Sequence, residues 1–438
     1  MCGIVGTWKL DRVQEADRAG LEDAMELLKH RGPDGRGRHI DEDRGLAMGH
    51  TRLSIIDLKT GDQPLIDSIT KNVLTVNGEF YDYKTIRAQL ATKGHRFQTK
   101  SDSEIALHLL RVHGLDFVHQ LRGEFAFALY DQAEDRLLLV RDRFGIKPLY
   151  YHLSEDRIVY GSEVKAILAM PEVPRALSRQ AALNQLMHVM VPGTTAFEEV
   201  KAVKPGHMLS IRKRNGRLEL KEIKYWDMEF PESKGYKGKR DPKLFIEEVR
   251  EGLIDAVRTR LEADVPVGCY LSGGIDSCSM LGLATPMQQS PVKAFTISFD
   301  HADYDESKIA AEMAESTGAD QVVLRLKGED LYGGPYVRAV WHAERTFYNT
   351  LGVAKWHMSR RVHECGFKVV VTGEGSDELF AGYPFFKRDY FQQDPKASKS
   401  KKDPANSDAL FQGAILAEEQ SHHPAFDDLC GFTPSWIQ

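Results

Sequence analysis

The chain of 438 residues changes its pattern of secondary structure once, and this change divides it into two domains of different classes. Up to about residue 208, short β-rich runs alternate with turns and with amphipathic stretches of helical spacing. This mixture predicts stacked antiparallel sheets covered by helices. After the polar stretch 230–242, strands are each followed by a small-residue turn and a helix. That order predicts a parallel sheet whose ligands gather at the carboxyl ends of its strands.

We therefore expect a first domain at residues 2–210, a connecting segment at 211–243 and a second domain at 244–438. The clearest expected strands are 74–78, 125–130, 136–141, 158–160, 265–271, 294–299 and 367–371. The clearest expected helices are 19–30, 103–113 and 277–284.

Composition excludes several classes of protein. With 42% hydrophobic and 28% charged residues, the chain is an ordinary globular protein, and its net charge of −6 offers no basic field for nucleic acid or for an anionic membrane. The sequence has neither a long apolar run nor a signal peptide pattern, so we expect a cytoplasmic protein. Its five cysteines form no Cys-x-x-Cys pair, which argues against a disulfide framework or a zinc site.

The N-terminus, Met1-Cys2-Gly3-Ile4-Val5-Gly6, places a thiol next to the initiator. Removal of Met1 would leave Cys2 with both its thiol and a free α-amine. An α-amine, with a usual pKa of about 7.7 to 8.0, can act as the base that a thiol needs near neutral pH. Cys2 is therefore a candidate nucleophile; the alternative is an ordinary start followed by a buried strand of small residues.

Five later residues can complete a site for an amino acid that carries a terminal amide. Arg52 can bind an α-carboxylate, and Glu79 can receive an α-ammonium. Asn77 and Gly78 follow a strand and can donate to an oxyanion, while Asp102 adds a second carboxylate at the start of a helix. Each has a simpler interpretation: a surface ion pair for Arg52, a turn at Asn77-Gly78 and a helix N-cap for Asp102.

The first domain resembles the class II glutamine amidotransferases, an N-terminal-nucleophile family. The matching motifs, in family order, are Cys2-Gly-Ile-Val-Gly6, His30-Arg-Gly-Pro-Asp34, Arg52-Leu-Ser-Ile, Asn77-Gly-Glu79, Ser101-Asp102 and Arg141-Asp-Arg-Phe-Gly-Ile-Lys-Pro-Leu-Tyr150. The resemblance implies that Cys2 attacks glutamine, with Asn77 and Gly78 as the oxyanion hole. It implies that Arg52, Glu79 and Asp102 also bind glutamine, and that two antiparallel sheets lie between helical layers.

Two glycine-rich turns in the second half suggest a nucleotide site. Ser272-Gly-Gly-Ile-Asp-Ser277 follows a strand and precedes a helix, where backbone N–H groups can approach phosphate oxygens and Asp276 can bind a metal ion. Thr372-Gly-Glu-Gly-Ser-Asp-Glu378 also follows a strand and holds three carboxylates, which suit Mg²⁺ or proton transfer. Taken singly, the first can be a plain bend and the second an acidic helix cap.

Together these turns resemble the synthetase domain of asparagine synthetases and related ATP pyrophosphatases, which has an α/β fold of the adenine-nucleotide α-hydrolase type. The resemblance implies that ATP is bound by Leu271, Ser272, Gly273, Gly274, Asp276, Ser277, Ile297, Thr372 and Gly373. It further implies that Asp276 and Asp377 bind Mg²⁺ and that Glu374 acts on the incoming amine.

The expected reaction has two halves: ATP adenylates a carboxylic acid and releases pyrophosphate, and ammonia made at Cys2 then displaces AMP. Aspartate is the expected acid, and a homodimer is compatible with this interpretation. Within the same superfamily, the phosphoribosyl-pyrophosphate amidotransferases and the glucosamine-phosphate synthases are alternatives, but neither the phosphoribosyl loop nor the sugar-phosphate isomerase domains are found in the sequence.

Two departures from the family pattern leave alternatives open. In the acceptor segment 349–355, Gly352 stands where an arginine is expected, and Lys355 is a possible replacement cation. The acceptor can therefore be a carboxylic acid other than aspartate, as in synthetase-like enzymes of secondary metabolism. The sequence also stops at Gln438, before the further helical region usual in the family, so we expect an incomplete synthetase domain. A regulatory or scaffold homologue without synthesis is the remaining alternative.

Overall fold

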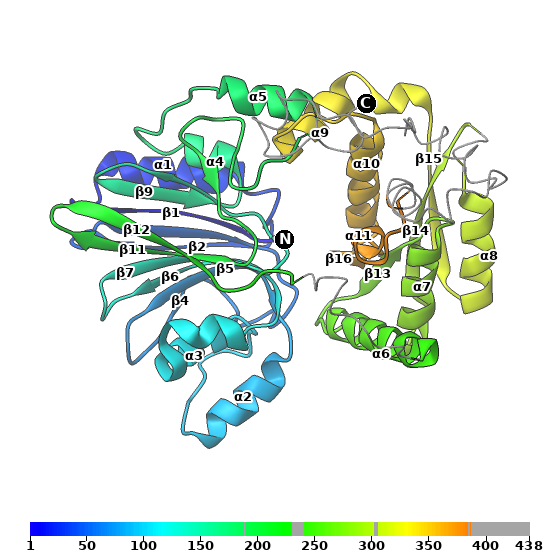
Figure 1. Ribbon diagram of the computed structural model, residues 1–438, viewed down its shortest axis with the longest axis horizontal. Coiled ribbons are helices and arrows are strands. Elements are labelled where there is room, and N and C mark those ends of the chain that lie inside the picture. Colours follow the sequence, from blue (N-terminus) through cyan, green and yellow to red (C-terminus); the bar gives the residue numbers. More distant parts are fainter. Residues whose placement is uncertain (188, 230–240, 302–304, 384–385, 387–438) are drawn as a thin grey trace. The chain divides into compact units, whose positions relative to one another are not determined.

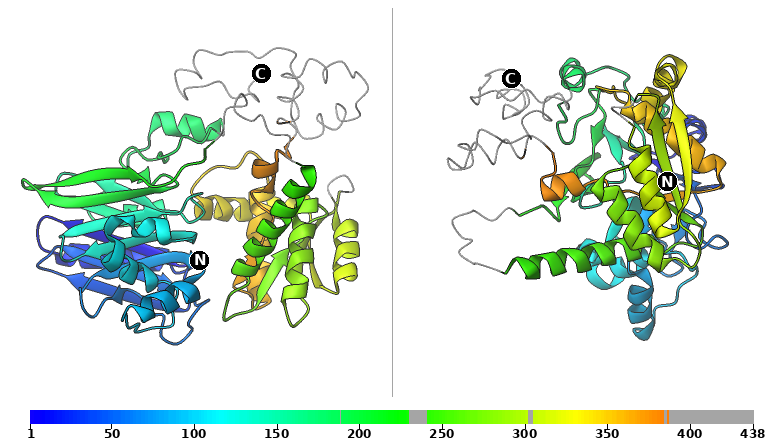
Figure 2. Two further views of the ribbon diagram at one scale, coloured as in Figure 1. Left: turned by 60° about the horizontal axis from the view of Figure 1, so that its bottom comes forward. Right: turned by 90° about the vertical axis from the view of Figure 1, so that its right-hand side faces the viewer.

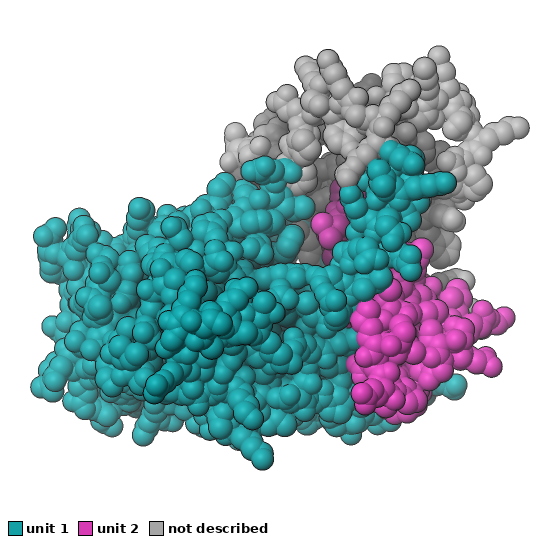
Figure 3. Space-filling model, turned by 90° about the horizontal axis from the view of Figure 1, so that it is seen from below, with its two compact units in different colours: residues 1–268, 299–302, 324–370 teal, residues 269–298, 303–323, 371–438 magenta. Residues whose placement is uncertain are grey.

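The computed structural model describes residues 1–187, 189–229, 241–301, 305–383 and 386 (Figure 1). They divide into two compact units (Figure 3). Within these described ranges, the first unit takes the residues of 1–268, 299–301 and 324–370, and the second takes those of 269–298, 305–323 and 371–386.

The first sheet places the N-terminal strand at its centre. Its order is β10-β8-β9-β1-β3-β2, and β1 pairs antiparallel with both β3 and β9. Gly3 pairs with Thr51, which brings Cys2 and Arg52 to the same end of two adjacent strands. The strands are β1 (Gly3–Lys9), β2 (Gly35–Asp41), β3 (Leu46–Arg52), β8 (Tyr150–Leu153), β9 (Arg157–Gly161) and β10 (Lys201–Ala202).

The second sheet has the order β12-β11-β7-β6-β5-β4, and its neighbouring strands are antiparallel. Asn77 and Gly78 lie within β5, paired with Ala126 and Phe125 of β6. The strands are β4 (Leu65–Ile66), β5 (Val73–Phe80), β6 (Gly123–Asp131), β7 (Arg136–Arg141), β11 (His207–Arg214) and β12 (Arg217–Lys224).

The two sheets and the helices beside them form four layers (Figures 1 and 2). Between the sheets, buried side chains such as Trp8 and Met48 of the first sheet pack with Tyr130 and Leu139 of the second. Helices α1 (Glu15–Leu27) and α4 (Val164–Leu168) bury apolar side chains against the outer face of the first sheet. On the second sheet, α2 (Tyr83–Thr92), α3 (Ile105–His113) and the 3₁₀ helix η1 (Gly114–Gln120) do the same. The expected sandwich is confirmed.

Strands β11 and β12 lie where the sequence predicts a connecting segment. The expected boundary at residue 210 falls inside β11, which pairs with β7 of the second sheet. The turn of this hairpin is Asn215-Gly216, with φ of 53° and 72°. Asn-Gly flanked by strand residues is a strong hairpin signal, so the sequence contained the information that the prediction overlooked. The sandwich therefore continues past residue 210.

The second half contains a four-stranded sheet with the order β15-β14-β13-β16, in which β13 and β14 are parallel. Each strand is separated from the next by helix, as expected for an α/β fold. The elements are α6 (Pro242–Arg260), β13 (Val267–Tyr270), α7 (Ile275–Ala284), η3 (Thr285–Met287), β14 (Lys293–Phe299), α8 (Ser307–Thr317), β15 (Asp320–Leu326), η5 (Gly328–Leu331), α9 (Gly334–Ala343), α10 (Leu351–Glu364), β16 (Val369–Val371) and α11 (Ser376–Phe380). Helix α5 (Arg179–Leu186) belongs to the first half.

Within the described part of the chain, every helix is too short or too polar to cross a membrane. Residues 230–240 of the expected connecting segment, and Gln438 with the residues before it from 387, lie outside the described residues.

Candidate active site

One pocket in the sandwich collects all the residues that the sequence predicts around the thiol. Cys2, Arg52, Asn77, Gly78, Glu79 and Asp102 line it together. They come from the start of β1, the end of β3, β5 and the loop before α3. The remaining lining residues are Met1, Leu53, Ile55, Ile56, Gly61, Gln63, Ser101, Ser103 and Lys147.

The Cys2 sulfur is held by backbone groups. The Leu53 N–H donates to Sγ at 3.4 Å, and Sγ lies 3.7 Å from the Leu53 carbonyl oxygen. Burial raises the pKa of the Cys2 thiol, so the thiol needs a base. Burial also lowers the pKa of the neighbouring Met1 α-amine to about 5, which leaves that amine unprotonated at neutral pH. The surroundings of Cys2 therefore keep an α-amine in its unprotonated form.

Asn77 is fully buried, and neither Oδ1 nor Nδ2 of its side chain has a hydrogen-bond partner among the described residues. A buried unpaired polar group costs about 1–3 kcal/mol, so such groups are retained mainly where a ligand pairs with them. Gly78 has a φ of 147°, and a Cβ there would lie 2.0 Å from the Glu124 carbonyl oxygen. Because both residues lie inside β5, the interpretation of Asn77-Gly78 as a simple turn is wrong.

The Arg52 side chain is buried and faces several acceptors. Its Nη1 donates to Oδ1 of the exposed Asp62 at 2.8 Å, as the ion-pair alternative predicts, and its Nη2 donates to the carbonyl oxygens of Ile56 and Asp57. A guanidinium has five N–H donors, so these three contacts leave donors for a carboxylate in the pocket.

Glu79 and Asp102 place two carboxylates in the same pocket. Asp102 is buried and accepts from the Phe80 N–H at 2.7 Å, whereas the N-cap of α3 is Glu104, so Asp102 is not the helix cap. Burial raises the pKa of Asp102 to about 6. Burial, and then the charge of Asp102, raise the pKa of Glu79 to about 7. An ammonium group between them would favour their ionised forms.

We expect Glu79→Gln to stabilise the fold above pH 7. The pKa of Glu79 in the folded protein lies above its usual value of 4.5. Glu79 therefore makes its full contribution to stability below pH 4.5, and this contribution is lost as the pH rises through 7. Glutamine removes the buried charge, so the variant should gain about 1–3 kcal/mol at pH 8 and little at pH 5. Thermal unfolding at both pH values measures this. The exposed Glu155→Gln is the control, and an equal shift at both pH values would contradict the expectation.

The structure also explains motif residues whose roles the sequence prediction left unassigned. Arg31 donates from Nε to the Cys2 carbonyl oxygen at 2.9 Å and from Nη1 to Glu163 at 2.9 Å. In the loop after β7, the buried Asp142 carboxylate accepts N–H groups of its own loop, including that of Lys147 at 3.0 Å. The first motif therefore positions the nucleophile, and the second presents Lys147 to the pocket.

In the second unit, the two glycine-rich turns touch each other. A Cβ on Gly373 would lie 2.8 Å from Cβ of Asp276. The first turn, at the N-terminus of α7, is closed by the hydroxyls of Ser272 and Ser277, which lie 2.9 Å apart. Burial, and then the charge of Asp377, raise the pKa of Asp276. Asp276 thus lies close to both Gly373 and Asp377.

The other predicted residues of this site lie in the same four-stranded sheet or directly after its strands. Leu271 is buried directly after β13, and its N–H donates to the Phe295 carbonyl oxygen at 2.8 Å. Ile297 lies in β14, and Thr372 and Glu374 follow β16. Among the residues described, no group of three or more His, Cys, Asp or Glu side chains could hold a metal ion. Asp276 and Asp377 could hold a cation here only if phosphate and water supplied its other ligands.

One residue at this turn was not predicted. The Gly273 N–H, expected to face phosphate, donates to the Glu306 carboxylate at 3.0 Å. A phosphate oxygen that takes this N–H has to displace Glu306. Glu306 lies 33 positions from Gly273 along the chain. In the sequence, the one signal for this contact is the general preference of acidic groups for turns rich in N–H groups.

In the acceptor segment, an aromatic ring fills the space beside Gly352. A Cβ on Gly352, in α10, would lie 2.6–2.9 Å from three ring atoms of Phe347. The ring occupies the space into which a side chain at 352 would project. Beside this segment lies a cavity lined by Tyr332, Gly333, Tyr336, Phe347, Tyr348, Asn349 and Thr350.

Comparison with known families agrees with the two domains that contain these sites. Residues 1–226 match the model of the glutamine amidotransferase domain, and residues 248–433 match that of asparagine synthase. The chain belongs to the glutamine-hydrolysing asparagine synthetase family. Asparagine synthetase 2 of Bacillus subtilis is 33% identical over 401 residues, covering 87% of this chain and 52% of that protein.

Two fungal proteins named amidases are more similar to the chain. The amidase chry2 of Gibberella zeae is 40% identical over 384 residues, covering 84% of this chain and 56% of that protein. The amidase chyE of Penicillium rubens is 39% identical over 388 residues, with 85% and 56% covered. The chain thus spans about half the length of the curated relatives it matches.

Proposed function

We propose that this protein carries out glutamine-dependent, ATP-consuming amidation of a carboxylic acid other than aspartate. The observation that carries the proposal is the contact between Phe347 and Gly352, which fills the place of the expected arginine with an aromatic ring. A cation there would suit the second carboxylate of aspartate, and an aromatic ring does not. The similarity to two proteins named amidases supports the same choice.

The first half-reaction takes ammonia from glutamine at Cys2. The α-amine left by removal of Met1 takes the thiol proton, and Sγ attacks the carboxamide carbon. Nδ2 of Asn77 and the N–H of Gly78 donate to the oxyanion. The amine returns the proton to the leaving nitrogen, and water then hydrolyses the thioester to glutamate. Arg52, with Glu79 and Asp102, holds the two charged α-groups of glutamine.

The second half-reaction activates the acid. Its carboxylate attacks the α-phosphorus of ATP, pyrophosphate leaves, and ammonia displaces AMP from the acyl-adenylate. The turns containing Asp276 and Gly373 would bind the nucleotide, and Asp276 with Asp377 would hold Mg²⁺, which when bound neutralises phosphate charge. Glu374 would accept a proton from the attacking amine. A reducing cytoplasmic setting is part of the proposal, because Cys2 must stay a free thiol.

Acceptor screening with ATP, Mg²⁺ and amide-¹⁵N glutamine tests this proposal. Because the cavity beside the acceptor segment is lined largely by aromatic rings, we expect acids with an aromatic or apolar body to yield a labelled amide and AMP at least about tenfold faster than aspartate. Mass spectrometry measures the amide, and nucleotide chromatography measures AMP. If asparagine is the amide formed fastest, the proposed acceptor is contradicted. If glutamate is released but no acid yields AMP, the protein does not complete synthesis.

A further inference from the structure

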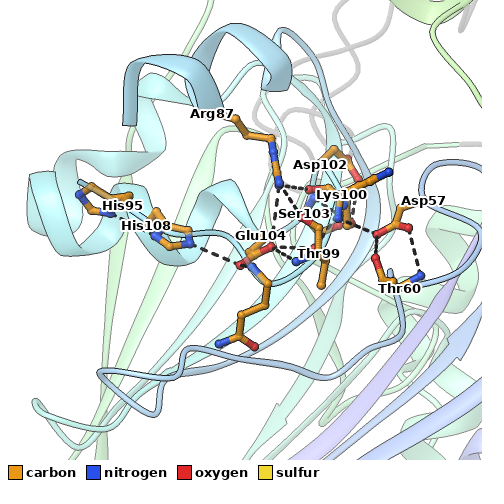
Figure 4. Close-up of polar contacts among 12 residues, drawn as sticks. Asp57, Thr60, Arg87, His95, Thr99, Lys100, Asp102, Ser103, Glu104 and His108 are labelled. Atoms are coloured by element: carbon orange, nitrogen blue, oxygen red, sulfur yellow. Dashed lines mark hydrogen bonds and ion pairs between the residues drawn. The ribbon is translucent and has the colours of Figure 1, made fainter. Parts of the chain in front are cut away.

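The loop that carries Asp102 is held from several sides by groups outside the pocket (Figure 4). The Glu104 carboxylate accepts the N–H groups of Gln98 at 2.7 Å and of Thr99 at 2.8 Å. Arg87 donates to the carbonyl oxygens of Thr99 and Ser101. Glu104 and Arg87 thus contact the backbone on the N-terminal side of Asp102.

Asp57 connects this loop to another one. Its side chain is buried, and Oδ2 accepts the Lys100 N–H at 2.8 Å. Within its own loop, Oδ1 accepts the Thr60 N–H at 3.0 Å and Oδ2 accepts the Thr60 hydroxyl at 2.5 Å (Figure 4). Although burial acts to raise the pKa of Asp57, these donors outweigh it and hold the pKa below its usual value. The carboxylate is therefore ionised, and it accepts three hydrogen bonds.

The main chain of Asp57 contacts the other side of the pocket. Its carbonyl oxygen accepts from Nη2 of Arg52 and from the Gly61 N–H, the latter at 3.2 Å. Its φ of 53° turns the chain so that the carbonyl group and the side chain face different neighbours. Asp57 itself does not line the pocket. A single residue thus contacts both Arg52 and the loop that carries Asp102.

We propose that Asp57 is a positioning residue for glutamine, holding Arg52 through its carbonyl oxygen and the Asp102 loop through its carboxylate. The inference rests on the proposed function, in which Arg52 binds the α-carboxylate of glutamine and Asp102 helps to bind its α-ammonium. Both groups are attached to one carbon atom, so their two partners must keep a fixed separation. A displacement of about 1 Å in such a site can cost roughly 10²-fold in rate.

Asp67 provides a matched control for a purely structural role. It is also buried, and its Oδ1 accepts two N–H groups of its own loop, those of Ile69 at 2.7 Å and Thr70 at 2.9 Å. Its carboxylate also pairs with Arg111 at 3.4 Å, and none of these three partners lines the pocket. A carboxylate that only stabilises its loop should behave like Asp67.

The test compares Asp57→Asn with Asp67→Asn in the full chain. Asparagine tolerates the left-handed φ at position 57. Its NH₂ group, however, replaces a carboxylate oxygen that accepted a hydrogen bond, and this group must then face an N–H or O–H donor from which it cannot accept. We expect Asp57→Asn to raise the KM for glutamine by about 10- to 100-fold, with a smaller change in kcat. The Kd for glutamine, measured in proteins that also carry Cys2→Ala, should rise by the same factor. Asp67→Asn should change both constants less than about twofold. Thr60→Val, which keeps the Lys100 contact, should change them less than about threefold.

Two glutamine analogues separate positioning from a general loss of the pocket. 4-Carbamoylbutanoate lacks the α-ammonium and 4-aminobutanamide lacks the α-carboxylate, so each uses only one of the two partners. We expect Asp57→Asn to weaken glutamine binding more than it weakens inhibition by either analogue. The inference would be overturned if Asp57→Asn weakened the binding of glutamine and of both analogues equally. It would also be overturned if Asp57→Asn and Asp67→Asn, at similar unfolding temperatures, changed the KM and Kd for glutamine equally. If the unsubstituted chain neither binds nor hydrolyses glutamine, the proposed function itself fails.

Discussion

Replacing Cys2 with alanine is expected to abolish glutamine hydrolysis, with a loss of at least about 10⁴-fold, while amide synthesis from free ammonia continues. The thiol is the only group in the pocket that we expect to form the covalent intermediate. The Leu53 N–H, 3.4 Å from Sγ, can only support a thiolate and cannot replace it. Glutamate release and amide formation, each measured with glutamine or with ammonium chloride at pH 8.5, separate the two activities.

Cys365→Ala is the control, because this partly exposed thiol ends helix α10 and is not among the pocket residues. It should leave both activities within about twofold of the unsubstituted chain. A folded Cys2→Ala protein that loses ammonia-dependent and glutamine-dependent synthesis equally would contradict the division into two sites.

Asp276→Asn should give the opposite result: AMP formation falls by at least about 10²-fold, and glutamine hydrolysis persists within about threefold. Burial, and then the charge of Asp377, raise the pKa of Asp276, and a divalent cation between the two carboxylates would relieve their repulsion. Asparagine removes one of the two charges that would attract the cation.

AMP release in the presence of the best acceptor measures the effect, and titration with Mg²⁺ shows whether excess metal restores it. Asp320→Asn is the matched control, because Asp320 is an exposed acid that pairs with Lys293 at the edge of the same sheet. An unchanged rate of AMP formation in Asp276→Asn would remove this residue from the proposed metal site.

The pocket around Cys2 was largely predictable, because its residues occur in short motifs next to strands. Cys2 and Arg52 meet through the register of two adjacent strands, and Asn77, Gly78 and Glu79 are consecutive in one strand. The sandwich and the α/β fold also followed from periodicity, whereas the hairpin at Asn215-Gly216 was missed despite a clear turn signal.

The residues that support the pocket could not be predicted in the same way. Arg31 pairs with Glu163 across 132 positions, and Asp57 contacts the Lys100 N–H across 43. Glu306 similarly reaches Gly273 from 33 positions away. Charged residues are common in any sequence, and no periodicity or short spacing identifies which two of them will meet. These contacts become visible only when the fold fixes the loops.

The contact between Phe347 and Gly352 also restricts how acid preference can change during evolution. With the ring 2.6–2.9 Å from the place of a Cβ, any side chain at position 352 has to move the ring. The two positions are therefore epistatic. An arginine at 352 requires either a displaced ring or a smaller residue at 347, so the packing of one aromatic side chain couples the two positions.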